Sequence, residues 1–164
     1  MDAIVLRPSL EADLDFVLEC ERDPAVAPYV SGWTRDRHRE ALADPDCRHH
    51  ILTHPADGRP LGFAMLFGCA SPHRCLELRR LACTERGRGF GRSALRALCR
   101  RAFDELGAHR LWLDVQLRNP RAIALYRSEG FREEGVLREC LFLDGHYLSM
   151  ALMSMLRHER PPAD

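Results

Sequence analysis

The sequence of 164 residues contains no lysine, so all 24 of its basic residues are arginines. They are balanced by 24 acidic residues, which leaves a formal net charge of zero. A chain with balanced charge has no overall attraction to nucleic acid or to an anionic membrane surface, so we expect neither as a partner. Any anion-binding site must therefore be local. The use of arginine alone is also what a GC-rich genome produces, so it carries no functional argument.

The chain also lacks the segments and spacings that mark several other classes of protein. No apolar run approaches the roughly 20 residues that span a bilayer. The opening "MDAIVLRPSL" lacks the basic region and apolar core of a signal peptide. Seven cysteines are present, but none are spaced as CxxC or combined with histidines as in a zinc site. We therefore expect a cytoplasmic protein with free thiols and no metal.

An apolar content of 46% and a charged content of 29% are typical of one globular domain. We expect this domain over residues 1–157 and a flexible tail over 158–164. Apolar periodicity predicts helices over 10–23, 35–43, 92–107 and 121–129. It predicts strands over 4–6, 50–53, 61–68, 76–83 and 110–115, and two long strands between Phe131 and Leu156 joined by the hairpin turn Asp144-Gly145.

The predicted order of elements is β-α-α-β-β-β-α-β-α-β-β. This order indicates an α/β fold in which helices flank a central, twisted, mixed sheet. The strand before residue 84 and the strand after residue 109 enclose a loop and a helix, so we expect them to run parallel, joined by a right-handed crossover.

The loop between that strand and that helix reads "TERGRGFGRS", from Thr84 to Ser93. Glycines alternate through it at positions 87, 89 and 91, and arginines stand at positions 86, 88 and 92. Free backbone N–H groups and the positive end of the helix dipole meet at such a loop. The stretch therefore predicts a backbone site for an anion.

Several ligands are compatible with such a loop. A nucleotide-triphosphate P-loop is excluded, because its lysine and its glycine spacing are missing. A dinucleotide fingerprint needs a third glycine where Arg92 stands, although Asp114 could serve as the ribose-binding acid, so an oxidoreductase stays as a less favoured alternative. A turn that binds nothing is disfavoured, because it would place three arginines at the positive end of a helix without a partner.

The third candidate is the pyrophosphate of coenzyme A. The string Arg86-x-x-Gly89-x-Gly91 matches the [RQ]-x-x-G-x-[GA] signature of the GNAT superfamily of N-acetyltransferases. The segments "ELRRLAC", "LWLDV" and "NPRAIALYRSEGFREEG" resemble successive motifs of that superfamily, in the right order, over nearly half the chain. The general layout is similar to that of ribosomal-protein N-terminal acetyltransferases. The linker "TERGR" is shorter than the usual one.

The resemblance implies that an acetyl group passes from acetyl-CoA to a primary amine by direct attack within a ternary complex. Tyr126, in the pattern N-x-x-A-x-x-x-Y, would protonate or hydrogen-bond the departing sulfur. Backbone N–H groups of residues 81–83 would stabilise the oxyanion. The residues predicted to bind the cofactor are Leu81, Ala82, Cys83, Arg86, Gly87, Arg88, Gly89, Phe90, Gly91, Arg92, Ser93, Asn119, Ala122 and Tyr126.

The catalytic base has two candidates. Glu77 is the acid of the strand before the loop, where some family members carry a catalytic glutamate, but it could equally be paired with Arg79. Asp114 is the second candidate. We expect Tyr29, Trp33 and His38, together with Glu77, to line the acceptor pocket.

The sequence does not decide the acceptor, which could be a peptide N-terminus or a small-molecule amine. A CoA-binding module without catalytic activity is the alternative function. The edge strand and the long apolar hairpin predict a homodimer.

Overall fold

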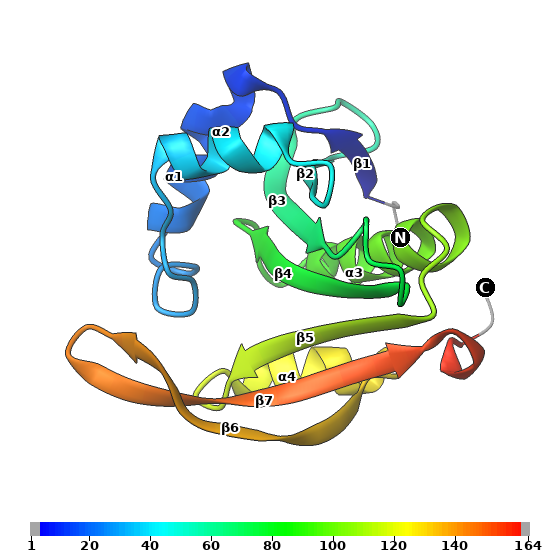
Figure 1. Ribbon diagram of the computed structural model, residues 1–164. Helices are drawn as coiled ribbons and strands as arrows, with labels where there is room; N and C mark the ends of the chain where they lie inside the picture. The colour runs from blue at the N-terminus through cyan, green and yellow to red at the C-terminus, as the bar shows by residue number, and fades with distance from the viewer. Residues whose placement is uncertain (1–3, 162–164) are drawn as a thin grey trace.

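A single pair of neighbouring strands in the sheet runs parallel: β4 (Cys75–Cys83) and β5 (Arg110–Gln116). The computed structural model describes residues 4–161, and within them seven strands form one sheet in the order β1-β2-β3-β4-β5-β7-β6 (Figure 1). The other neighbouring pairs are antiparallel. The predicted mixed sheet and the predicted parallel crossover through the glycine-rich stretch are therefore confirmed.

The remaining elements follow the predicted order. The strands are β1 (Val5–Pro8), β2 (Arg48–Thr53), β3 (Pro60–Phe67), β6 (Arg132–Leu143) and β7 (His146–Leu156). The helices are α1 (Leu14–Arg22), α2 (Arg35–Ala43), α3 (Phe90–Arg100) and α4 (Pro120–Ser128). Short turns are η1 (Glu11–Asp13), η2 (Arg101–Glu105, a π-helical turn that extends α3) and η3 (Arg157–Glu159).

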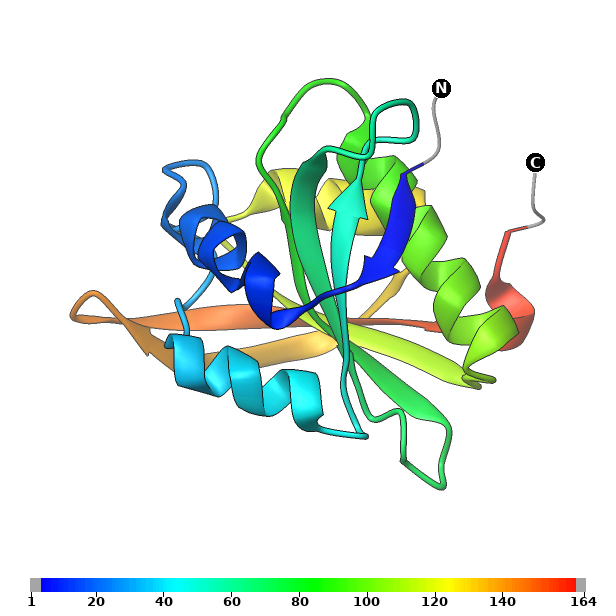
Figure 2. The same cartoon turned by 90° about the horizontal axis from the view of Figure 1, so that it is seen from above.

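Helices cover both faces of the twisted sheet (Figure 2). On one face, apolar residues of α3 pack against alternate residues of β3, β4, β5 and β7, and Leu95, Leu98 and Phe103 are among the fully buried ones. On the other face, α1 and α2 cover Phe63 and Met65 of β3. The side-chain alternation along each strand thus divides the protein into two cores, one on each side of the sheet.

The parallel pair β4–β5 is short. Its paired positions are Cys75 with Arg110, Leu76 with Leu111 and Glu77 with Trp112, after which the two strands diverge. Figure 1 shows the opening that results between them, which we call the split.

A β-bulge lies in β4 just beyond these pairs. Met65 of β3 pairs with Arg80, while the next residue, Leu66, pairs with Leu78, so Arg79 is the extra residue. A bulge bends its strand and increases its twist, and this one lies where β4 turns away from β5. The apolar alternation of residues 76–83 did not reveal it.

The C-terminal segment differs from the prediction of a flexible tail over 158–164. Arg160 pairs with Asp104 at 2.5 Å, and Glu159 pairs with Arg132 at 3.1 Å. The backbone N–H of Leu156 also donates to Glu159 at 3.0 Å. The prediction is therefore wrong for residues 158–161, which these contacts hold against η2 and β6, and residues 162–164 lie outside the described part of the chain.

Candidate active site

A cavity of about 700 Å³ opens beside the end of β4. It lies between the glycine loop (residues 84–89), α4 and the α1–α2 loop (residues 23–34). Its lining comprises Ala25, Val26, Tyr29, Val30, Leu81, Ala82, Cys83, Glu85, Arg86, Gly87, Gly89, Phe90, Gly91, Arg92, Asn119, Arg121, Ala122, Ala124, Leu125, Tyr126 and Ser128. Most of the residues predicted to bind the cofactor thus surround one space.

The backbone of the glycine loop has the conformation that its glycines predict. Gly87 and Gly89 have φ angles of 81° and 78°, in the left-handed region that other residues rarely adopt. Gly89 is the N-cap of α3, and the first bond inside the helix joins the N–H of Ser93 to the Gly89 carbonyl at 3.0 Å. The N–H groups of residues 90–92 precede that bond, so they have no partner within the helix and can serve an anion.

The three arginines of the loop have different roles. Arg86 lines the cavity. Arg92 also lines it but forms an ion pair with the buried Glu129. Arg88 lies outside the lining, where it donates to Glu85 at 3.5 Å. The prediction that Arg88 meets the cofactor is therefore not supported by its position.

Two further residues on the cofactor side change the predicted set. Ser93 lies outside the lining, because its hydroxyl accepts the backbone N–H of Ile4 at 2.8 Å and so connects α3 to the start of β1. Arg121 lines the cavity and was not among the predicted residues. Its place in the first turn of a helix capped by Asn119 was a signal that could have found it.

The start of α4 brings the second predicted motif to the cavity. Asn119 caps the helix, since its side-chain oxygen accepts the N–H of Ala122 at 3.2 Å, and both residues line the cavity. Tyr126 lies two turns further along, packed against Phe131 at a ring distance of 5.8 Å. Burial raises the pKa of Tyr126 to about 12, with a smaller contribution from the charge of Asp114. The phenol is therefore protonated at neutral pH.

The residues predicted for the acceptor pocket do not all lie at the cavity. Tyr29 lines it, with Ala25, Val26 and Val30 from the same loop, which were not predicted. Trp33 lies outside the lining and packs in the second core, 5.3 Å from the ring of His38. His38 is fully buried in α2, so the prediction that it lines the pocket is wrong.

A buried glutamate of α1 holds the α1–α2 loop through a hydrogen bond to its backbone. The Glu21 side chain is only 2% exposed, and its Oε2 accepts the backbone N–H of Trp33 at 2.8 Å. The same carboxylate lies 3.3 Å from His38 and 3.9 Å from the Arg80 guanidinium. His38 continues this polar chain to His49 at 3.2 Å, and His49 contacts Ser9 at 2.7 Å.

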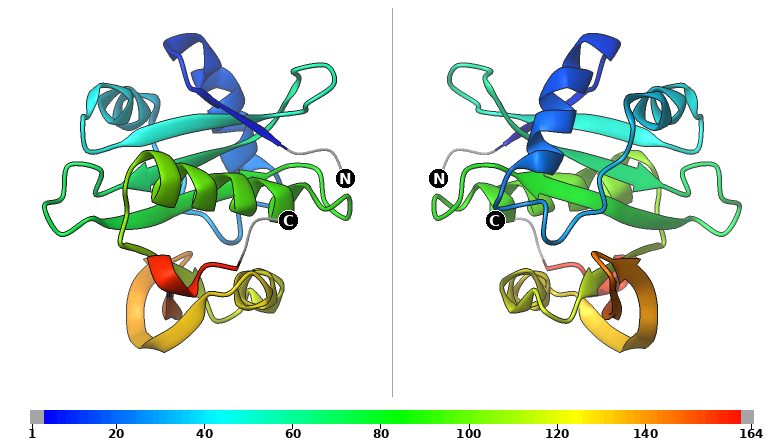
Figure 3. Two further views of the ribbon diagram at one scale, coloured as in Figure 1. Left: turned by 90° about the vertical axis from the view of Figure 1, so that its right-hand side faces the viewer. Right: turned by 90° about the vertical axis from the view of Figure 1, so that its left-hand side faces the viewer.

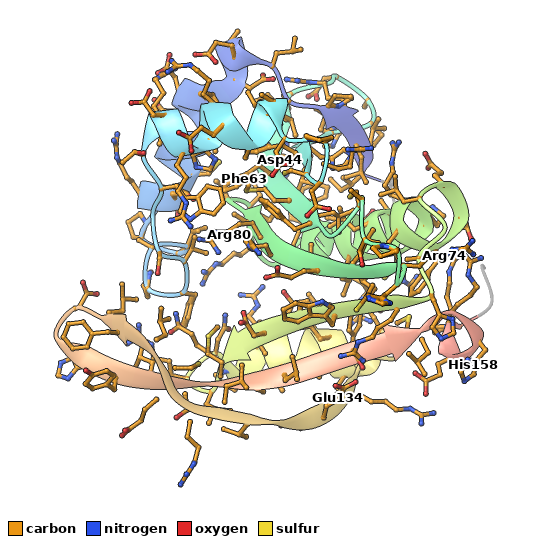
Figure 4. All side chains as sticks on the ribbon, viewed as in Figure 1. Asp44, Phe63, Arg74, Arg80, Glu134 and His158 are labelled. Atoms are coloured by element: carbon orange, nitrogen blue, oxygen red, sulfur yellow. The ribbon has the colours of Figure 1, made fainter. Side chains whose placement is uncertain are left out.

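Two arginines connect the same loop to the two sides of the split. Arg80 of β4 donates to the Ser31 carbonyl at 2.9 Å, and Figure 4 shows Arg80 reaching from β4 toward the loop. Arg118, which follows β5, donates to the Pro28 carbonyl at 2.7 Å. The α1–α2 loop therefore crosses the split between β4 and the strands β5, β7 and β6, as the right-hand view of Figure 3 shows.

The two carboxylates considered as bases differ in their partners. Arg79 holds Glu77 with hydrogen bonds of 3.1, 3.1 and 2.6 Å. Asp114 is exposed on β5, two residues beyond the last β4–β5 pair. Neither lines the cavity itself. Desolvation raises the pKa of Asp114, and the nearby charge of Glu77 raises it further.

Two other properties concern only the part of the chain that the structure describes. Within residues 4–161, no helix is long and apolar enough to cross a membrane. Across the same residues, no cluster of three or more histidine, cysteine or acidic side chains has the arrangement of a metal site.

Residues 14–131 match the model of the acetyltransferase (GNAT) family. The match covers the glycine loop, the split and the start of α4, which are the parts that form the cavity. The chain belongs to this family. The chain is also 35% identical, over 113 residues, to the spermidine N(1)-acetyltransferase of Vibrio cholerae, a match that covers 68% of this chain and 65% of that enzyme, just under two thirds of its length.

Solved structures agree with this relationship. The spermidine N-acetyltransferase from Vibrio cholerae in complex with CoA and spermine superposes with a TM-score of 0.85 at 25% identity, covering 96% of this chain and 97% of that one. A dodecameric structure of the same enzyme superposes with a TM-score of 0.79 at 25% identity, covering 94% of each chain. The resemblance to ribosomal-protein N-terminal acetyltransferases is therefore corrected, because these relatives are polyamine enzymes.

Proposed function

We propose that this GNAT protein transfers an acetyl group from acetyl-CoA to a primary amine of a small molecule. The observation that carries the proposal is the single cavity shared by the glycine loop, Tyr126 and the α1–α2 loop. An anion-binding loop, a proton donor and a variable loop around one space are the parts that acetyl transfer from a nucleotide thioester requires.

The donor would be held mainly by backbone groups. The N–H groups of residues 90–92 would receive the pyrophosphate of CoA, while Arg86 and Arg121 supply positive charge at the rim of the cavity. A side chain at Gly87 would meet no other atom within 4 Å, so there is open space for a ligand beside the backbone. The edge of β4 that faces the split would carry the acyl part of the donor, near Leu81 and Cys83.

Tyr126 would supply the proton for the departing sulfur. A CoA thiolate is a better leaving group when a donor protonates it or forms a hydrogen bond to it. With a pKa of about 12, the phenol keeps its proton until the thiolate forms. The same burial in the wall of the cavity holds the ring in one position.

A small acceptor is favoured by the α1–α2 loop and by the relatives. Arg80 and Arg118 hold this loop across the split, which narrows the approach for a folded protein chain. The relatives named above act on spermidine, so a polyamine is the first acceptor to test. The peptide N-terminus expected as an alternative acceptor stays a prediction.

The test measures free thiol released from acetyl-CoA by the full chain in the presence of different amines. The panel contains spermidine, spermine, aliphatic monoamines, aromatic amines and a short peptide with a free N-terminus. We expect saturable release with at least one small amine and slower release with the peptide. Binding of CoA without release by any amine would contradict the proposal, as would release with the peptide alone.

We also infer that the chain associates with copies of itself through the β6–β7 hairpin. Large apolar side chains are exposed there, namely Val136, Leu137, Phe142 and Tyr147. The Vibrio enzyme is dodecameric in one structure, which supports association without defining the number of copies here. Light scattering on the protein and on Phe142→Ser tests the inference: we expect a smaller particle for the variant, and an unchanged mass would contradict it.

A further inference from the structure

Two carboxylates lie at the split, those of Glu77 and Asp114, and the first already forms an ion pair with Arg79. The Glu77 side chain is only 14% exposed, and both of its oxygens accept hydrogen bonds from Arg79. An amine could reach either oxygen only by displacing the Arg79 guanidinium from this bidentate pair. Glu77 is therefore poorly suited to accept a proton from a substrate.

Asp114 is in the opposite situation. Its neighbours Leu113 and Val115 are buried in the core that contains α3, so its side chain lies on the opposite face of the sheet, the face that α1 and α2 cover. The acceptor would approach on this face. The carboxylate is exposed, and no side chain within residues 4–161 forms a hydrogen bond or an ion pair with it. It is thus a carboxylate at the apex of the split that is free to bind a cation.

Charged groups from two elements influence Asp114. The charges of Glu77, Arg79 and Arg80 on β4 act on its carboxylate, and Tyr126 of α4 interacts with it electrostatically. Its direct partner on β7 is the apolar Leu152. Desolvation and the charge of Glu77 raise the pKa of Asp114 more than the two arginines lower it. A raised pKa makes a carboxylate a better proton acceptor.

We propose that Asp114 binds the ammonium group of the acceptor and takes its proton, with Tyr126 acting on the leaving sulfur. The inference rests on the proposed acetyl transfer and assigns the base within it. One N–H proton passes to an Asp114 oxygen, and the freed nitrogen lone pair forms a bond to the thioester carbonyl carbon. The C–S bond then breaks, and its electron pair leaves on sulfur, which takes the Tyr126 proton. The second amine proton is lost as the amide forms, and solvent exchange restores both side chains.

The experiment compares Asp114→Asn with the matched variant Glu77→Gln, using the amine that the wild-type chain acetylates best. We expect kcat/KM for the amine to fall by about 100-fold or more in Asp114→Asn, and by less than 10-fold in Glu77→Gln. CoA affinity, measured by calorimetry, should stay within about threefold in both. Asp114→Glu should recover part of the lost rate.

The pH profile separates a base from a merely structural residue. In the wild type, kcat/KM should decline as pH falls through the raised pKa of Asp114, because the protonated carboxyl accepts nothing. This acid limb should persist in Glu77→Gln and disappear from the residual activity of Asp114→Asn.

Two outcomes overturn the assignment of Asp114. One is a full rate and an intact acid limb in Asp114→Asn. The other is an acid limb that disappears in Glu77→Gln instead. A wild-type chain that acetylates no amine would refute the proposed function itself, so the two failures are distinguishable. If Asp114→Asn folds poorly, the pH profile of Asp114→Ser gives the same decision.

Discussion

The proposed site has two sides that are built in different ways. We call the glycine loop with the starts of α3 and α4 the donor side, and the α1–α2 loop with the split the acceptor side. On the donor side, the groups available to a ligand are mainly backbone N–H groups, which come from one loop and the two helices α3 and α4. On the acceptor side, charged side chains from distant segments shape the site: Glu21, Arg80 and Arg118 hold the α1–α2 loop, and Asp114 of β5 is exposed in the split. The first side depends on local conformation, and the second depends on tertiary contacts.

The two sides correspond to two ways of recognising a substrate. A cofactor that many enzymes share can be bound by a loop whose geometry glycines define. An acceptor that varies between enzymes is recognised through side chains. In this protein Glu21, Arg80 and Arg118 hold the α1–α2 loop, which contributes such side chains to the cavity. We therefore expect some substitutions to alter only the binding of acetyl-CoA and others to alter only the binding of the amine.

After Asp114→Asn, the largest effect should come from Tyr126→Phe. The variant keeps the ring that packs against Phe131 but loses the proton donor, so kcat should fall by about 100-fold while CoA affinity changes by less than about threefold. Steady-state kinetics and calorimetry measure the two quantities. Wild-type turnover in this variant would remove Tyr126 from the mechanism.

A smaller effect, limited to the binding of CoA, is expected for Gly89→Val. Its φ of 78° is strained for valine, and the added side chain stands at the first turn of α3, so CoA affinity should fall by about 30-fold. Gly58→Val is the matched control, because Gly58 also has a positive φ, 69°, but lies in the β2–β3 turn with no atom within 4 Å of the added Cβ. It should lose stability with CoA affinity unchanged. Equal losses of CoA affinity in both variants would show that strain alone is responsible.

Each side contains one buried glutamate, Glu21 on the acceptor side and Glu129 on the donor side, so the same substitution can be compared on both. In Glu21→Gln, the weaker hold on Trp33 and Arg80 should raise KM for the amine by about 10-fold and leave KM for acetyl-CoA unchanged. In Glu129→Gln, Arg92 loses its partner, so KM for acetyl-CoA should rise by about threefold with no change for the amine. Both variants altering both constants would show that the two sides are not independent.

The smallest expected effect concerns the pH dependence of stability. Burial lowers the pKa of His49 to about 3 and that of His50 to about 4. Below about pH 6.5 the unfolded chain takes up protons that the folded chain excludes, so the free energy of unfolding should fall as pH falls. At pH 5.5 the loss is about 1 kcal/mol for each histidine.

His49→Gln tests this loss against the wild type. The difference in unfolding free energy between the two proteins should shift by that amount between pH 7 and pH 5.5, as measured with urea. A difference that does not vary with pH would show that His49 does not titrate in this way.

Much of the donor side could be predicted from the sequence, because its signals are local. Glycine alternation located the loop that holds the left-handed residues 87 and 89, and apolar periodicity predicted a helix over 121–129, where α4 lies. The roles of Arg88 and Ser93 were not predictable in the same way. Their partners are Glu85 and the backbone of Ile4, and the second lies 89 residues away in the chain.

The acceptor side was predicted less well for the same reason. His38 and Trp33 were expected at the pocket because they lie in or near a loop, yet they pack against residues of α1 and β3 that no local pattern connects to them. Glu77 was preferred to Asp114 because of its strand. The sequence offered its ion pair with Arg79 as an alternative but did not reveal the bulge at Arg79.

The order of the elements, the mixed sheet and the position of the glycine loop could all be inferred from local signals, because they depend on apolar periodicity and on glycine backbone freedom. Which carboxylate lacks a side-chain partner, which arginines face the cavity and what holds the α1–α2 loop became known from the folded chain alone. Those properties depend on side chains that meet across the divergence of β4 and β5. Their separation in the chain carries no periodic signal, so they exist only once the sheet has formed.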